Sequence, residues 1–467
     1  MSVPWAGGTV VDVDGAATWV LDGEPVLGWR CGSSATIDGV SSVVHAHPVT
    51  AELDELRYGF AAGPLRLELR HSLDETWAIR LSVTNPTSRP VTVSGIALDL
   101  ACAAGWIGWA VRAGAEASVA VLPAQRQRPI LGFCLLQGEL RGAGGALRLP
   151  DLVLPAAGQY VLRLRGESYP DARHFASAAR HDVLPGWPWV SAGELVRIDH
   201  QDQAVASSSG IDSDQLAELE GAVELEGEAG QTSHIELVGP RGTTEVMVAF
   251  APTLGQVVAG RVALGEQLWP TNRQGVRLTE PADGLVVQAF LAGGGSTGVS
   301  HEVWSEALDS LCARVEADSS LLAVALLARQ AVLTGDRDQA EQSAAGFAAL
   351  VGEPGAPVVA AQVLAAGLVT GAVHEVPATG AVLDDLPAFG ARFGFGLRGE
   401  RVGTPDPVAD ARCLALANMQ LALEPPRPRG WACGFAELVQ RHRRRLLTQT
   451  YGDPGAAETV AWLTLGE

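Results

Sequence analysis

The sequence predicts a multidomain β plus α protein, with a large antiparallel β-sandwich, a second and smaller β-module, and a C-terminal all-α domain of helical hairpins. Three observations support this prediction. The chain has 467 residues, more than one ordinary hydrophobic core accommodates. Short segments that alternate apolar and polar residues fill its first part and are bounded by Gly, Pro, Asn and Asp. After residue 300, apolar residues recur every three or four positions, which is the period of a helix.

Residues 1–190 are expected to form the large sandwich. Period-2 alternation predicts strands within LRLELRHSL, WAIRLSVTN and VTVSGIALDL, at residues 65–73, 77–85 and 91–100. Asn85 and Pro86 begin a turn and Pro90 lies just before the next strand, so this segment predicts a hairpin with its two strands side by side. Many strands in succession are typical of a sandwich or barrel.

Residues 191–298 are expected to form the second β-module or a continuation of the first. The strand candidates are ELVRIDHQ, AVELEGEA, TSHIELVGP, TEVMVAFAP and GLVVQAFLAG, and three glycines at residues 293–295 mark the end of the β-region. Residues 200–221 are polar and rich in small side chains, which is the composition of a loop or linker.

Residues 299–467 are expected to be helical. The segment Leu321–Leu350 has apolar residues at helical spacing on both sides of Gly335, which suits the end of the first helix, and Asp336 resembles the cap of the second. Residues 374–407 are rich in Gly, Pro and Phe and are expected to form a long loop, the first candidate for a lid. Further helices are expected at about 300–317, 357–371, 406–423, 435–450 and 456–465.

The composition limits partners, compartment and chemistry. The net charge is −20 and all 33 basic residues are arginine. An acidic surface repels phosphate backbones and anionic lipid, so neither a nucleic acid nor a membrane is an expected partner. The absence of lysine excludes a Schiff base or a Walker lysine, and no cofactor is expected. Six widely spaced cysteines and the lack of a visible signal peptide favour a cytoplasmic location.

The order of the predicted regions resembles that of a known enzyme family. A long β-sandwich with a segment of the NPTSRPVTV type, followed by helix pairs such as LARQAVLTGDRDQAEQ, resembles the layout of glucoamylase and glycogen-debranching-type glycoside hydrolases. In that family a mutarotase-like supersandwich precedes an α/α toroid whose loops carry two catalytic carboxylates. The resemblance implies a carbohydrate-related protein, either glycoside-hydrolase-like or glycan-binding.

The helical region is shorter than that family requires. Roughly 165 residues provide about half of the helices of a closed toroid with six helix pairs. The competing hypothesis is therefore a non-catalytic scaffold or a partner subunit of an enzyme complex.

The segment ESYPDARHFASAARHDVLPGWPWV, residues 167–190, is the main candidate for a ligand site. Its aromatic side chains would stack on sugar rings and its charged side chains would bind hydroxyl groups, so the expected ligand is a carbohydrate or another small polar molecule. The alternative is a domain junction whose tryptophans are buried in a core. The substrate-binding candidates are Tyr169, Asp171, Arg173, His174, Trp187 and Trp189.

The segment GVSSVVHAHPVTAELDELRYG, residues 39–59, matches the spacing of the first cupin motif. Alternate residues of a strand share a face, so His45 and His47 are candidate metal ligands, with Glu52 as an oxygen ligand. The second cupin motif is absent downstream, and two histidines beside Pro48 are also typical of a strand end. A metal-dependent cupin-like enzyme is the weaker alternative.

Acidic pairs in the helical region are the candidates for glycoside hydrolysis. This reaction needs two carboxyl groups roughly 5 to 10 Å apart. Asp384 and Asp385 lie in the expected lid, and Glu302 and Glu306 share one face of an expected helix. The catalytic candidates are Asp384, Asp385 and Glu302, although glutamates four residues apart on a helix are also typical of a solvated surface.

Overall fold

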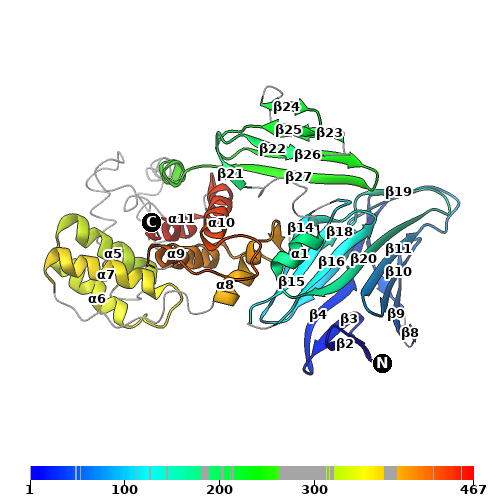
Figure 1. Ribbon diagram of the computed structural model, residues 1–467, viewed down its shortest axis with the longest axis horizontal. Coiled ribbons are helices and arrows are strands. Elements are labelled where there is room, and N and C mark those ends of the chain that lie inside the picture. Colours follow the sequence, from blue (N-terminus) through cyan, green and yellow to red (C-terminus); the bar gives the residue numbers. More distant parts are fainter. Residues whose placement is uncertain are drawn as a thin grey trace.

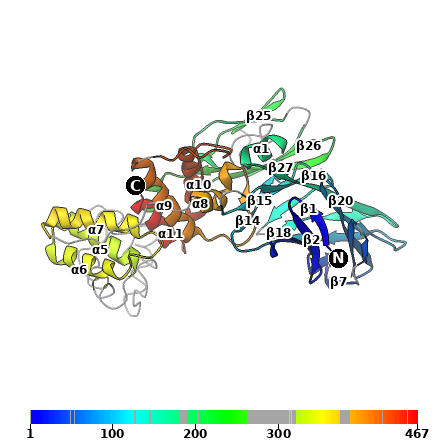
Figure 2. The same ribbon diagram turned by 60° about the horizontal axis from the view of Figure 1, so that its bottom comes forward.

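The expected β plus α fold is confirmed by the computed structural model, in which several antiparallel sheets precede a helical C-terminal region (Figure 1). A second view shows the same separation of the β-rich and helical parts (Figure 2). The structure describes residues 2–47, 50–52, 54–112, 114–125, 128–143, 146–179, 189–200, 204–210, 212, 215–261, 312, 315, 320–372, 386–423, 425–453 and 455–466.

The N-terminal sheet forms one layer of the sandwich. Its tight turns at Asp14-Gly15 and Asp22-Gly23 have positive φ at both residues, as two-residue hairpin turns require. In spatial order its strands are β1 (Ser2–Trp5), β2 (Gly8–Val13), β3 (Ala16–Leu21), β4 (Glu24–Cys31), β13 (Ala97–Cys102), β18 (Ala146–Arg148) and β17 (Arg141–Ala143).

The large sheet forms the opposite layer. Alternate residues of its strands are buried against the N-terminal sheet, where Trp77 contacts Trp5 and Phe133 at ring-centroid distances of 5.2 and 5.7 Å. In spatial order its strands are β28 (Glu400–Arg401), β14 (Trp106–Arg112), β15 (Ser118–Pro123), β16 (Ile130–Gln137), β20 (Gln159–Tyr169), β11 (Trp77–Thr84), β10 (Leu65–Leu73), β9 (Glu55–Ala62) and β7 (His45–Ala46), and β8 (Thr50–Glu52) also pairs with β9.

The predicted hairpin through Asn85 is wrong. Strand β11 ends in the large sheet, whereas the next strand, β12, belongs to a separate small sheet in the order β19 (Leu152–Leu154), β12 (Val91–Ser94), β5 (Ser34–Ile37) and β6 (Val40–Val43). The buried Asn85 amide donates to the carbonyls of Arg89, Leu154 and Pro155 at 2.8, 3.1 and 2.9 Å. These bonds hold a connection between two sheets, and Pro86 within it has no N–H to pair with a neighbouring strand.

The second β-module has its own core around Ile198, Ile235 and Phe250. Residues 200–221, expected to form a loop, contribute the edge strands β23 and β24, so that expectation is wrong for these strands. Cross-strand partners stabilise polar strands of low intrinsic propensity. One sheet contains β21 (Trp189–Ser191), β27 (Gly242–Ala251), β26 (Thr232–Gly239) and β23 (Ala204–Ser209), and the other contains β22 (Val196–Asp199), β25 (Ala222–Leu225) and β24 (Leu216–Leu219).

The helical region contains the hairpin predicted from Gly335 and Asp336. Gly335 adopts the left-handed conformation with φ 72°, and Asp336 accepts hydrogen bonds from the N–H groups of Asp338 and Gln339. The described helices are α1 (Ala172–Ala178), α5 (Leu321–Thr334), α6 (Arg337–Ala348), α7 (Ala356–Thr370), α8 (Leu386–Arg392), α9 (Pro407–Leu423), α10 (Phe435–Thr450) and α11 (Ala457–Leu465), with the 3₁₀ turn η2 (Gly394–Gly396).

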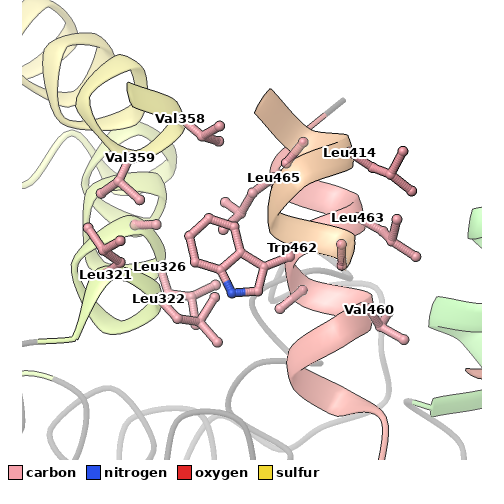
Figure 3. Close-up of a cluster of buried hydrophobic side chains, with 14 of the residues drawn as sticks. Leu321, Leu322, Leu326, Val358, Val359, Leu414, Val460, Trp462, Leu463 and Leu465 are labelled. Carbon is pink, nitrogen blue, oxygen red and sulfur yellow. The ribbon is translucent and has the colours of Figure 1, made fainter. Parts of the chain in front are cut away.

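Two groups of helices pack around Trp462. The fully buried ring of Trp462 on α11 lies between α5 and α7 on one side and α9 on the other (Figure 3). No helix in the part of the chain that the structure describes combines the length and apolar composition needed to cross a bilayer. The helix expected at 300–317 lies outside the described residues except for Cys312 and Val315, as does the strand expected at 284–293.

The expected long loop at 374–407 is wrong for its second half, which forms α8, η2 and β28 and attaches the helical region to the large sheet. Strand β28 pairs with β14, where Arg401 lies opposite Trp109. The Trp109 ring is buried and donates from Nε1 to the carbonyl of Arg398 at 3.2 Å. The first half, residues 374–385, lies outside the described residues.

The substitution Gly399→Ala is expected to weaken this attachment. A Cβ atom at Gly399 would lie 2.0 Å from the carbonyl oxygen of Ala110. Gly403 has a similar positive φ and no atom within 4 Å of its Cβ position, so Gly403→Ala is the matched control. We expect Gly399→Ala to lower the free energy of unfolding by about 1–3 kcal/mol more than the control, measured by thermal unfolding. Equal losses in both variants would contradict this view of the junction.

Protonation of His71 is expected to destabilise the sandwich in acid. His71 is fully buried and accepts a hydrogen bond from Trp77 Nε1 at 3.0 Å, and burial lowers its pKa to about 3. The unfolded chain therefore binds a proton near pH 6.5 that the folded chain does not. Stability contributed by neutral His71 is complete above this pH and is lost as the pH falls toward 3.

The variant His71→Gln tests this pH dependence, because glutamine keeps an acceptor for Trp77 without titrating. Between about pH 7 and pH 5, wild-type protein should lose about 2 kcal/mol more than the variant. Urea unfolding followed by tryptophan fluorescence measures the difference, with the exposed His45→Gln as control. An unchanged pH slope in His71→Gln would show that His71 does not contribute.

Candidate functional site

A cavity of about 590 Å³ lies where the helical region meets the large sheet. Four segments that are distant in sequence form the described part of its lining, which is typical of small-ligand sites between domains. They are Pro123, Gln125, Arg128 and Ile130 near the β15–β16 turn, Pro170–Ala172 before and within α1, Leu386, Pro387 and Phe395 from α8 and η2, and Arg427–Trp431 before α10.

Asp171 is held in this cavity by the start of α1. Its carboxylate accepts a hydrogen bond from the His174 N–H at 2.9 Å and contacts His174 Nδ1 at 2.7 Å. Partial burial opposes ionisation of Asp171, but these bonds outweigh it and lower the pKa of the carboxyl group below its usual value. Asp171 is therefore a fixed, ionised acceptor at neutral pH.

Gly430 allows the helical region to approach Asp171 closely. It has φ +79°, and a Cβ atom there would lie 2.7 Å from the Asp171 Cβ. The carbonyl of Gly430 accepts a hydrogen bond from the Arg173 N–H at 3.1 Å. Glycine is needed here for both the backbone conformation and the space.

Aromatic side chains form the apolar wall. Trp431 is stacked on Phe389 with a ring-centroid distance of 6.3 Å, and Phe395 meets Trp431 edge to face at 5.7 Å. Phe395 has φ 50°, an uncommon conformation for a residue other than glycine, and its carbonyl accepts from the Ala432 N–H at 2.8 Å. Phe395 and Trp431 therefore form the aromatic part of the lining and are held by contacts with each other and with the buried Phe389.

Three arginines give the cavity a positive charge in a chain with a net charge of −20. Arg128 forms an ion pair with Asp22 at 2.8 Å. Arg427 and Arg429 are exposed and form no ion pair or hydrogen bond with any described residue. Guanidinium groups bind planar anions through two parallel hydrogen bonds. The cavity can therefore bind an anionic group.

The six predicted sugar-binding residues are separated by the structure. Asp171 lines the cavity, and Arg173 and His174 are exposed on the first turn of α1 beside it. Tyr169 is partly buried and donates to Glu167 at 3.0 Å rather than lining the cavity. Trp189 is 2 % exposed in the helical core, where its ring faces the Arg445 guanidinium, and Trp187 lies outside the described residues.

The contacts of the cavity do not test the predicted roles of the metal-binding and catalytic candidates. His45 and His47 are exposed at the β7 edge of the large sheet, while the side chain of Glu52 is not described. No group of three His, Cys, Asp or Glu side chains is close enough to hold a metal within the described ranges. Glu302, Asp384 and Asp385 lie outside those ranges. Both assignments stay predictions.

Sequence reasoning missed the arginines and the tryptophan of the cavity. Arg427, Arg429 and Trp431 lie in the segment PPRPRGW, which has no helical or strand period. The available signal was a short Pro- and Arg-rich connection that ends in tryptophan between two strongly predicted helices. Functional residues often lie on such loops.

The substitution Gly430→Ala is expected to displace Asp171. The new methyl group would overlap the Asp171 side chain and break the cap of α1, at a cost of about 1 kcal/mol. Gly452 is the matched control, because it has φ +75° and no atom within 4 Å of its Cβ position. Gly430→Ala should lower the melting temperature more than Gly452→Ala in thermal unfolding. The proposed contact would be refuted by identical melting temperatures.

Comparison with known proteins gives a structural match only. No family model matches the chain, and no curated protein matches its sequence. Sixteen chains of solved structures match its fold. One of them is a polysaccharide lyase, with a TM-score of 0.58, 13% identity, and coverage of 91% of this chain and 76% of the lyase chain. At this identity the match shows a shared fold.

Proposed function

We propose that the protein is a carbohydrate-binding protein whose ligand occupies the cavity between the large sheet and the helical region. The observation that carries this proposal is the combination of an aromatic wall, a fixed carboxylate and two arginines without a partner among the described residues, in one cavity of about 590 Å³. The fold that the chain shares with a polysaccharide lyase supports the same class of ligand.

Each part of the cavity suits one part of an acidic sugar. Phe395, which is partly exposed, and the edge of the buried Trp431 offer apolar surface for a pyranose ring. Asp171 accepts hydrogen bonds from hydroxyl groups, and Arg427 with Arg429 binds a carboxylate or sulfate. The proposed ligand is therefore a saccharide with at least one anionic group.

Arg427→Gln combined with Arg429→Gln tests the ligand site. Loss of charge-assisted hydrogen bonds costs about 1.5–3 kcal/mol, so the double variant should bind an acidic oligosaccharide at least about tenfold more weakly. Isothermal titration with uronate-containing, sulfated and neutral oligosaccharides measures this change. Arg337→Gln on α6 is the control, because Arg337 is exposed and does not belong to the cavity lining. Absence of binding to every saccharide, or unchanged affinity in the double variant, would refute the proposal.

Catalysis on a bound saccharide is a further part of the proposal. Asp171 is the carboxylate in the described lining, and Asp384 and Asp385 directly precede Leu386, a lining residue, in sequence. Glycoside hydrolysis needs two carboxyl groups, and Asp384 or Asp385 is the proposed second one beside Asp171. New reducing ends without ultraviolet absorbance of an unsaturated sugar indicate hydrolysis, whereas their appearance with that absorbance indicates elimination. If neither product appears, the protein binds the saccharide without cleaving it.

A scaffold or partner subunit is the second candidate function. Helix α7 has no charged residue and presents Leu364, Leu368 and Val369 to solvent, with Leu368 84% exposed. An apolar face of this kind is typical of a protein–protein contact. Size-exclusion chromatography of the purified protein with and without cell extract distinguishes a self-sufficient monomer from a subunit.

A further inference from the structure

Four arginines lie in a row across the large sheet. In the strand register, Arg57 on β9 is directly opposite Arg70 on β10, Arg70 is opposite Arg80 on β11, and Arg80 is opposite Arg163 on β20. Adjacent strands are about 4.8 Å apart, so the four Cα positions span about 14 Å in a line perpendicular to the strands. We call these four residues the arginine row.

The arginine row lies on the face of the sheet that points away from the sandwich core. Its sequence neighbours Leu56, Leu69, Ile79 and Leu162 are buried in that core, and alternate residues of a strand point to opposite faces. The side chains of Arg57 and Arg70 are 38% and 36% exposed, and Arg163 is exposed. In Figure 1, α1 and the helical region lie toward the β14–β16 end of the sheet, whereas β9, β10 and β11 form the opposite end.

The positive charge of the row is only partly neutralised. Glu55 forms ion pairs with Arg57 and Arg70. Arg80 and Arg163 form no ion pair or hydrogen bond with any residue that the structure describes, and the Arg80 Nε atom is buried without a partner there. The other charged residues on these strands and this face are Arg66, Glu68, Arg165 and Glu167, of which the last two pair with each other.

Such a row costs stability in the free protein. Like charges directly opposite each other on neighbouring strands destabilise a sheet, and here this arrangement occurs three times in succession. A chain with a net charge of −20 has many acidic residues with which arginines could pair. A local arrangement that opposes folding is typical of a functional site.

We propose that the arginine row is a binding site for a linear polyanion, specifically an acidic polysaccharide with carboxylate or sulfate groups. Evenly spaced guanidinium groups in a line match a ligand with repeated anionic groups, each held by paired hydrogen bonds. Single-stranded nucleic acid is disfavoured because β9, β10 and β11 place no aromatic side chain on this face for bases to stack on. On β20 the aromatic residue of this face is Tyr169, which lies six residues from Arg163 and contacts Glu167 and Phe175.

The row is separate from the cavity. Strand β20 carries Arg163 and ends at Tyr169, next to Pro170 of the cavity lining, and seven residues of strand span roughly 20 Å. The row and the cavity are therefore two separate surfaces that can be altered one at a time. His45 lies opposite Ala61 of β9 and so shares the outward face at the edge of the sheet.

The double variant Arg80→Thr with Arg163→Thr tests the row. Threonine suits a strand and removes two charges that have no partner among the described residues, so the variant should melt at the same temperature as wild type or higher. The probes are polygalacturonate, dextran sulfate, neutral dextran and a single-stranded oligonucleotide. Both proteins carry Arg427→Gln and Arg429→Gln, so that the proposed cavity site does not contribute to binding. The protein with the intact row should bind the first two probes, more weakly as salt increases, and Arg80→Thr/Arg163→Thr should bind them at least about tenfold more weakly.

Two controls make the outcome decisive. Arg148→Thr removes an exposed strand arginine from the N-terminal sheet and should leave polyanion binding unchanged. The cavity variant with Arg427→Gln and Arg429→Gln should retain binding at the row, which distinguishes failure of this proposal from failure of the cavity proposal. Unchanged polysaccharide affinity in Arg80→Thr/Arg163→Thr, or equal binding of the oligonucleotide, would overturn the inference.

Discussion

The attachment of the helical region to the large sheet is the constraint on which the cavity depends. Strand β28 adds two residues to the sheet beside β14, and the buried Trp109 ring packs against the left-handed turn at Gly394, where any Cβ atom would overlap it. The cavity walls come from both parts, so its shape is set by this junction. The short contact between Asp171 and Gly430 exists only when the two parts are held in this position.

Sequence reasoning succeeded where structure depends on neighbours along the chain. The helices around Gly335 and Asp336 were predicted because their caps and apolar periods are local, and both caps form. It failed where pairing depends on distant strands. Asn85 reads as a hairpin turn, but its amide bonds to Leu154 and Pro155, about seventy positions further on, and so joins two sheets.

In the candidate site, too, local patterns predicted some residues, and contacts between distant segments determined the others. Asp171 was identified from a polar and aromatic segment, yet Trp189 of that segment is buried in the helical core. The burial of Trp189 depends on partners such as Arg445, which lie far away in sequence. The pattern of residues 167–190 therefore does not predict it. Arg427 and Arg429 were missed because a loop has no periodicity, and their importance comes from facing the β15–β16 turn some three hundred residues earlier.

The distribution of arginine connects the two proposed sites. In a chain this acidic, surface arginine is expected to find carboxylate partners, and Arg30, Arg89 and Arg337 do. Two arginines of the cavity, Arg427 and Arg429, and two of the arginine row, Arg80 and Arg163, instead have no such partner among the residues that the structure describes. An overall negative charge repels a long polyanion, so binding requires local positive charge strong enough to act within a Debye length of about 10 Å. Arg427 and Arg429 in the cavity and the four arginines of the row provide such charge at the two proposed sites.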